Sequence, residues 1–310
     1  MQVGQISVFA SYVVQILSNL VMISMMLLQL ARGKACAERV VEVLDTEIDI
    51  VNPENAFVPT EPKGEVEFKN VNFKYDPESH GDNILENISF KAKPGQIVGI
   101  VGGTGCGKSS LVNLIPRLYD ATQGEVLVDG VNVKKYDLKA LREMIGVVLQ
   151  KNVLFSGTIE ENIRWGKKDA THEEIVAACK AAQADSFINE QPDGYNTYLA
   201  QGGLNLSGGQ KQRLCIARAM IKKPKILILD DSTSAVDTAT EAKIRESFYS
   251  DLKDTTVFII AQRISSVKDA DEILVVDDGK IKGVGNHDEL IKTNEIYQEI
   301  YNTQQKGVLE

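Results

Sequence analysis

Eight residues in the first half of the chain form the pattern that most constrains its fold. They match the spacing G-x-x-x-x-G-K-[ST] and follow a short apolar run at residues 96–101. Residues 109–118, which come next, have the composition of a helix. A buried strand, a glycine-rich loop and a helix are therefore expected in succession, as in an α/β domain. The eight residues are Gly102, Gly103, Thr104, Gly105, Cys106, Gly107, Lys108 and Ser109.

The same loop has the chemistry of a phosphate-binding site. Its glycines let backbone N–H groups close around phosphate oxygens, and the helix that follows adds the positive end of its dipole. Lys108 can reach the β- and γ-phosphates of a nucleotide, and the Ser109 hydroxyl can bind Mg²⁺. A glycine-rich turn without a ligand is the alternative. It is disfavoured because the flanking strand and helix are those that the motif requires.

A pair of aspartates supplies the acidic partner of this loop. The apolar run at residues 226–229 predicts a buried strand, and it ends in Asp230 and Asp231. A carboxylate at the end of a buried strand can hold Mg²⁺ through water, and we assign that role to Asp230. The alternative is an aspartate that only caps a turn, and the phosphate loop in the same chain argues against it.

The first 31 residues contain no charged side chain and predict a transmembrane helix. About 20 apolar residues span the hydrocarbon core of a bilayer. Arg32, Lys34 and Arg39 follow at once, so the positive-inside rule puts the C-terminal end of the helix in the cytoplasm. A signal peptide would have a charged start and a shorter apolar core. A buried helix of a soluble protein is disfavoured by the length and by the absence of charge.

Polar side chains in this segment indicate that the helix has neighbours. Ser7, Ser11, Gln15 and Ser18 recur on one side at helical spacing. They can line a wet cavity or hydrogen-bond to adjacent helices, and the sequence leaves both open. A single span cannot form a transport path, so further helices from elsewhere are expected.

Charge and cysteine content argue against nucleic-acid binding, a zinc site and a disulfide framework. The net charge is −9 and there is no basic stripe, which argues against a nucleic-acid partner. The four cysteines are scattered, which argues against a zinc site and a disulfide framework and favours a reducing compartment for the domain after the helix. These cysteines are Cys36, Cys106, Cys179 and Cys215.

A five-residue sequence, LSGGQ, makes the chain resemble the ATP-binding-cassette (ABC) ATPases. It comprises Leu206, Ser207, Gly208, Gly209 and Gln210, and a helix is expected directly after it. In that family this signature clamps ATP held by the phosphate loop of a partner subunit, so that two ATPs lie between two cassettes. The resemblance implies a RecA-like core, an antiparallel β subdomain and a helical subdomain at about 151–222. It also implies a last transmembrane helix with its extension at 1–50, a linker at 51–63, a nucleotide-binding domain at 64–304 and a tail at 305–310.

Other landmarks of the family follow in the expected order. The resemblance implies that Tyr75 stacks on adenine, although a plain strand aromatic is the alternative. It implies that Ser110 belongs to the ATP site, that Gln150 is a Mg²⁺ ligand and that Asp237 belongs to a loop crossing the dimer interface. Residues 155–159 and 162–163 resemble the exporter branch. ATP and Mg²⁺ are the implied cofactors.

Two departures from the family pattern concern hydrolysis. Asp231 stands where competent members have a glutamate that polarises the attacking water, and Gln262 stands where they have a histidine. Aspartate is shorter by one methylene, about 1.5 Å, and misplacement by about 1 Å can cost roughly a hundredfold in rate. Glutamine cannot become cationic. Both changes predict a site that binds ATP and hydrolyses it slowly or not at all. A third departure, Gln201 in place of glutamate, has no physical account.

Three functions remain on this basis. The first is a subunit of a heterodimeric ABC exporter in the cell membrane, with a cytoplasmic cassette and a second half-transporter as partner. Family exporters have six helices per half, so this chain is expected to be a fragment or a split gene product, and the transported substrate is not revealed. The second is a non-transport ABC ATPase, which would place long heptad stretches between the two motifs. The third is an ATP-binding regulatory module without meaningful turnover.

Overall fold

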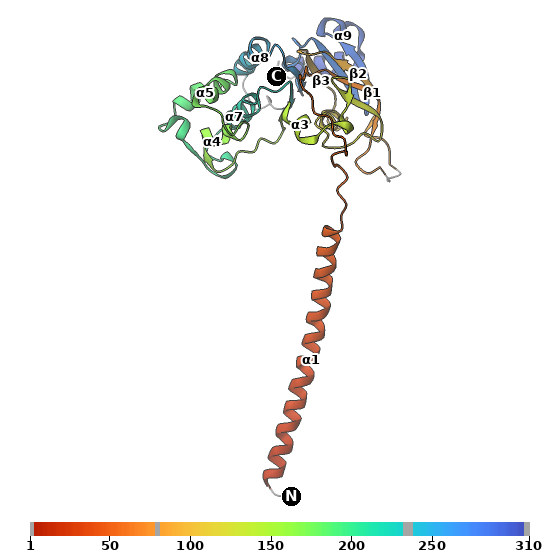
Figure 1. Cartoon of the computed structure of the whole chain (residues 1–310), viewed down its shortest axis with the longest axis vertical. Helices are drawn as coiled ribbons and strands as arrows, with labels where there is room; N and C mark the ends of the chain where they lie inside the picture. Colours follow the sequence, from red (N-terminus) through yellow and green to blue (C-terminus); the bar gives the residue numbers. More distant parts are fainter. Residues whose placement is uncertain (1–2, 78–80, 232–237, 307–310) are drawn as a thin grey trace. The chain divides into compact units, whose positions relative to one another are not determined.

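The computed structural model describes residues 3–77, 81–231 and 238–306, in two units, 1–49 and 50–310 (Figure 1). The first unit is helix α1, Val3–Leu44, whose described side chains are exposed. Among the described residues, α1 alone is long and apolar enough to cross a membrane, with a mean hydropathy of 1.9 over its most apolar 18 residues. Its 42 residues extend for roughly 63 Å, about twice the hydrocarbon core. A membrane-spanning α1 would therefore project several turns beyond the bilayer.

The described residues of the second unit form three sheets. A six-stranded sheet has the order β12-β11-β3-β10-β9-β6, with only the β11–β12 pair antiparallel among its described pairs. A four-stranded antiparallel sheet has the order β2-β1-β4-β5, and β7 pairs with β8. The strands are β1 Val66–Phe73, β2 Leu85–Ala92, β3 Ile97–Val101, β4 Gln123–Val128, β5 Val131–Asn132, β6 Ile145–Val148, β7 Gly157–Thr158, β8 Tyr198–Leu199, β9 Ile226–Asp230, β10 Thr256–Ile260, β11 Glu272–Asp277 and β12 Lys280–Gly285.

Helices of this unit gather in part into a separate lobe. Figure 1 shows α4, α5 and α7 together, apart from the region of β1, β2 and α9. This arrangement confirms the expected α/β class with an antiparallel sheet and a helical subdomain. The helices are α2 Lys108–Asn113, α3 Leu138–Glu143, α4 Ile159–Arg164, α5 His172–Ala181, α6 Asp185–Asn189, α7 Gly208–Met220, α8 Thr238–Asp251, α9 His287–Thr293 and α10 Glu295–Lys306.

Both faces of the six-stranded sheet are buried, which explains its apolar strands. In β9, Leu227 and Leu229 pack into one core with residues of the helical lobe. Ile226 and Ile228 pack into a second core with residues of the four-stranded sheet. Since successive side chains of a strand point to opposite faces, burial on both sides requires a continuous apolar run. The runs at 96–101, 226–229 and 256–260 have this form.

Two expected elements differ in the structure. The helix expected at 109–118 ends at Asn113, because Pro116 has no backbone N–H to donate and Arg117 adopts a left-handed φ of 51°. The alternating patterns at 65–68 and at 71–75 each predict a separate strand, but the structure has a single strand, β1, with irregular register after Phe68. The early end of α2 turns the chain and brings Tyr119 against Tyr75, with ring centroids 4.9 Å apart.

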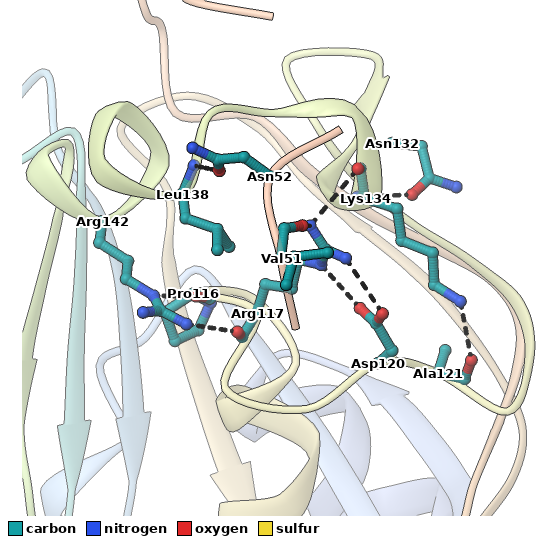
Figure 2. Close-up of polar contacts among 10 residues, drawn as sticks. All are labelled: Val51, Asn52, Pro116, Arg117, Asp120, Ala121, Asn132, Lys134, Leu138 and Arg142. Atoms are coloured by element: carbon teal, nitrogen blue, oxygen red, sulfur yellow. Dashed lines mark hydrogen bonds and ion pairs between the residues drawn. The ribbon is translucent and has the colours of Figure 1, made fainter. Parts of the chain in front are cut away.

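Arg117 binds the segment that precedes β1 to the core of the second unit. Its Nε and Nη2 donate to the two carboxylate oxygens of Asp120 at 2.8 and 3.2 Å (Figure 2). Its Nη1 donates to the carbonyl oxygens of Val51 at 3.2 Å and of Lys134 at 3.4 Å. The Arg117 side chain is 7% exposed. A buried guanidinium therefore holds the backbone of the expected linker.

Two further sets of hydrogen bonds, made by Asn52 and by Asp129, hold the same segment. Asn52 accepts from the backbone N–H of Leu138 and donates to the Asp137 carboxylate, both at 2.8 Å. The Asp129 carboxylate accepts from three consecutive N–H groups at 63–65, at 2.8 to 2.9 Å. Residues 51–65 are therefore bound to the folded unit at several points along their length.

Candidate nucleotide-binding site

The glycine-rich loop lies where β3 ends and α2 begins, and two of its glycines have no room for a side chain. An added Cβ on Gly102 would collide with the carbonyl oxygen of Val276 in β11. An added Cβ on Gly107, where φ is 98°, would lie 2.8 Å from Leu85 Cδ2. These two positions need glycine, so the loop can pass tightly between the strands and curl around an anion.

Lys108 sits at the mouth of this loop. Its Nζ donates to the carbonyl oxygens of Gly102 at 3.0 Å and Gly103 at 2.6 Å. The side chain is half-buried, so its charge is held beside the loop and is not free to range through solvent. A positive charge in this position attracts a polyphosphate towards the backbone N–H groups.

Asp230 ends β9 opposite the loop. It is 8% exposed and accepts from the Ser109 hydroxyl at 3.0 Å. Burial raises the pKa of Asp230, while the Ser109 hydrogen bond and the charge of Lys108 offset part of that rise. The Ser109 hydroxyl and the buried Asp230 carboxylate form an all-oxygen donor set that fits Mg²⁺, and Gln150 lines the same cavity. The site would hold the ion only with phosphate and water as further ligands.

Asp231 follows with a left-handed φ of 47°. Its Oδ2 accepts from Nε2 of Gln262 at 2.6 Å and from Nε2 of Gln150 at 3.4 Å. Burial and the neighbouring charge of Asp230 raise the pKa of Asp231, and the two amide hydrogen bonds and Lys108 lower it in part. The Asp231 carboxylate is therefore held between two glutamine side chains.

The raised pKa values predict that ionisation of this aspartate pair costs stability. A carboxyl with a raised pKa binds protons more tightly in the folded chain, so stability is lost as the pH rises through that pKa. Asp230→Asn keeps an acceptor for Ser109 and removes the charge. In EDTA, we expect Asp230→Asn to raise the melting temperature more at pH 7 than near pH 4, close to the ordinary pKa of an aspartate. Equal changes at both pH values would contradict the effect of burial.

Ten of the residues assigned from the sequence line one cavity of about 460 Å³, whereas Tyr75, Cys106, Gly107 and Ser110 are not part of its lining. Its lining combines the phosphate loop and α2 with the ends of β9 and β10. It also includes four residues of α10 that the sequence did not indicate, because no local motif marks them. The lining residues are Gly102, Gly103, Thr104, Gly105, Lys108, Ser109, Gln150, Asp230, Asp231, Ile260, Gln262, Glu299, Ile300, Thr303 and Gln304.

Comparison with known proteins identifies the domain. The profile of the ABC transporter family matches residues 85–234. This chain carries the cassette of the ABC transporter family. YknU of Bacillus subtilis, an uncharacterized ABC transporter ATP-binding protein, is 43% identical over 98% of this chain and 52% of its own length. The ATP-dependent lipid A-core flippase of Haemophilus influenzae is 44% identical over 90% of this chain and 47% of its own length.

A solved structure supports the same assignment. A bacterial Atm1-family ABC exporter with ATP bound matches with a TM-score of 0.82 and 37% identity, over 88% of this chain and 47% of that one. The chain thus spans about half the length of the curated relatives it matches. The assignment to the ABC ATPases, a branch of the P-loop NTPases, implies nucleotide binding.

Tyr75 of the cassette lies outside the lining of the cavity described above. Tyr75 is 51% exposed, and its hydroxyl forms a 2.8 Å hydrogen bond with the hydroxyl of Ser110 in α2. Phe73 and Tyr119 each meet the Tyr75 ring edge to face at 4.9 Å. Tyr75 is therefore oriented by α2 and two aromatic neighbours.

The half-buried Cys106 lies within 3.8 Å of Lys108 Nζ.

The LSGGQ residues of the cassette lie at the start of α7, away from the cavity lining. Ser207 caps the helix by accepting from the Gln210 N–H at 3.3 Å, and the Gln210 side chain accepts from the Ser207 N–H at 2.9 Å. Leu206 is buried beneath the turn, whereas Ser207 and Gly208 are exposed and Gly209 is half-buried. Asp237, expected at the dimer interface, lies outside the described residues.

Proposed function

We propose that this cassette binds ATP with Mg²⁺ and powers export across a membrane as one half of a two-cassette transporter. One observation carries the nucleotide part of the proposal. The phosphate loop, Lys108, Ser109 and Asp230 surround a single cavity, although they come from distant parts of the chain. That set offers a cradle of backbone N–H groups, a cation and an oxygen donor pair, which are the groups that a metal-bound triphosphate needs.

Each residue has a distinct task in this proposal. Backbone N–H groups of the loop bind the phosphates, and Lys108 turns from the loop carbonyls to the β- and γ-phosphates. Ser109, Asp230 and Gln150 hold Mg²⁺, which would neutralise charge on the phosphates. Tyr75, steadied by Ser110, offers a ring face to the adenine.

The same site is poorly equipped for hydrolysis. The Asp231 carboxylate is short, and amides of Gln150 and Gln262 already engage it. General-base assistance is typically worth about 10² to 10⁴ in rate, and it depends on reach to the attacking water. Gln262 would contact the γ-phosphate as a neutral donor. We infer that turnover at this site is slow or absent, and that the exposed LSGGQ turn serves a competent site on a different partner subunit.

Export is the transport direction that the similar proteins favour. YgaD of Bacillus subtilis, a putative multidrug export ATP-binding/permease protein, is 44% identical over 89% of this chain and 47% of its own length. With α1 as a membrane span and cations at its C-terminal end, the cassette would lie on the cytoplasmic side. An export path would need further membrane helices beside α1, in a multi-pass assembly.

An ATP-binding regulatory module without meaningful turnover is the second candidate. The hydrogen bonds that hold Asp231 between two glutamines favour it. Measured side by side, ATP binding and γ-phosphate release separate the two. Binding with phosphate release that depends on Lys108 supports a slow enzyme, and binding with none supports the module.

The test of the nucleotide proposal is calorimetry on the full chain in detergent, with Mg²⁺ and a non-hydrolysable ATP analogue. Lys108→Ala removes a charged hydrogen-bond donor, so we expect the Kd to rise roughly 10- to 100-fold. Lys253→Ala is the matched control, since Lys253 is exposed just before β10 and the cavity lies at the other end of that strand. A folded chain that binds no analogue, with Lys108→Ala behaving identically, would sink the proposal.

A further inference from the structure

The C-terminal helix α10 forms one wall of the nucleotide cavity. Glu299, Ile300, Thr303 and Gln304, on successive turns, line it together with the phosphate loop. The helix is anchored at its start, where Tyr297 is fully buried and its hydroxyl meets His287 Nδ1 at 2.8 Å. The wall is therefore fixed at one end, and its later turns reach the site.

The Gln304 side chain forms two hydrogen bonds with the loop after β10. Its Nε2 donates to the carbonyl oxygen of Gln262 at 2.7 Å, and its Oε1 accepts from the backbone N–H of Ile264 at 2.9 Å. Ile264 is buried, so both the packing of its side chain and the Gln304 amide restrain the loop. A planar amide that bonds both a carbonyl and an N–H restricts rotation as well as distance.

The contact of Gln304 with Gln262 is linked by a further hydrogen bond to Asp231 in the cavity. Gln262, whose backbone Gln304 holds, donates through its side chain to Asp231 at 2.6 Å. Asp231 in turn accepts from Gln150 at 3.4 Å. Two hydrogen bonds therefore connect the last turns of α10 to the carboxylate beside the expected metal site. A change in the position of Gln304 must change the position from which Gln262 reaches into the cavity.

We propose that Gln304 is a positioning residue, which sets where the Gln262 amide meets the γ-phosphate of bound ATP. The inference rests on the proposed nucleotide site and extends it to the C-terminal helix. It predicts discrimination between ATP and ADP, since ADP lacks the group that Gln262 would contact. A merely structural role for Gln304 would weaken both nucleotides equally or neither.

Two measurements on the full chain in detergent test this inference. In Gln304→Ala, we expect hydrogen exchange of the Ile264 amide to accelerate roughly 3- to 10-fold, because that N–H loses its acceptor. The Kd for MgATP should rise roughly 2- to 10-fold, while that for MgADP changes less than about twofold. Gln305→Ala, one residue further along α10 and exposed, should leave both values unchanged.

A second variant removes only the hydrogen bond from Gln304 to the carbonyl oxygen of Gln262. Gln304→Glu keeps an acceptor for the Ile264 N–H but replaces the donor to the Gln262 carbonyl with a second acceptor. It should keep slow exchange at Ile264 and still lose preference for ATP. Unchanged exchange in Gln304→Ala, or equal weakening of ATP and ADP in either variant, overturns the positioning role. If the unmodified chain binds neither nucleotide, the proposed function fails first and this inference with it.

Discussion

Replacing Asp231 with glutamate and Gln262 with histidine should raise the ATP turnover of this chain by about 10² to 10⁴. Glutamate extends the carboxylate by about 1.5 Å towards the attacking water. Histidine can carry a positive charge to the γ-phosphate as negative charge shifts in the transition state. Asp231 has a left-handed φ of 47°, a conformation that aspartate adopts more readily than glutamate, so the backbone opposes part of this gain.

The measurement is phosphate release by the full chain in detergent, at concentrations that let its own LSGGQ turns face the phosphate loops of a second copy. Asp231→Asn with Gln262→His is the control, because it carries the histidine without a base. Adding Lys108→Ala to the active pair should abolish the gain, which would exclude a contaminating ATPase. An unmodified chain as fast as the Asp231→Glu, Gln262→His variant would end the idea of a degenerate site.

The Asp231→Glu change by itself tests the two hydrogen bonds that the Asp231 carboxylate accepts. Gln150 and Gln262 each donate to the same Asp231 oxygen. If these bonds hold the carboxylate away from water, Asp231→Glu alone should gain only part of the increase, since Gln262 would still engage it. The two changes are in contact, so their effects need not add.

Parts of the fold and of the cavity follow from local sequence patterns. The phosphate loop and the strand ending at Asp230 are continuous stretches whose apolar runs and glycines specify their own conformations. Parallel strands then bring their carboxyl ends to one edge of the sheet, and for this reason Lys108, Asp230 and Gln262 lie around one cavity. Two elements differ from the prediction. Helix α2 is shorter, because Pro116 and the left-handed turn at Arg117 end it early, and the two strands expected at 65–68 and 71–75 are one strand, β1.

The contacts that escaped prediction join segments far apart in the chain. Gln304 meets Gln262 across 42 residues and Arg117 meets Val51 across 66. Each is a single side chain bonded to a distant backbone, so neither leaves a repeat or a characteristic spacing in the sequence. The contact of Tyr119 with Tyr75 depends on where α2 stops. Such contacts become visible only after the packing of the core has fixed the surrounding loops.

Arg117→Met should destabilise the cassette by roughly 3 kcal/mol. Removing one partner of a buried ion pair typically costs about 3 to 5 kcal/mol, and the lower value applies because Asp120 stays 29% exposed and can regain water. The carbonyl oxygens of Val51 and Lys134 also lose their donor. For a domain of this size, a loss of that order lowers the melting temperature by roughly 6 to 12 °C.

Thermal unfolding of the full chain in detergent measures this loss, and Lys139→Met is the matched control. Lys139 also pairs with a carboxylate, that of Glu143 at 3.9 Å, but the two side chains are 84% and 62% exposed. Exposed pairs contribute little, so the control should melt with the unmodified chain. The Arg117 variant should also open the segment it holds, so that a glutamate-specific protease cuts faster at Glu54. If Arg117→Met melts like the control and Glu54 stays protected, residues 51–65 are held by Asn52 and Asp129 without help from the guanidinium.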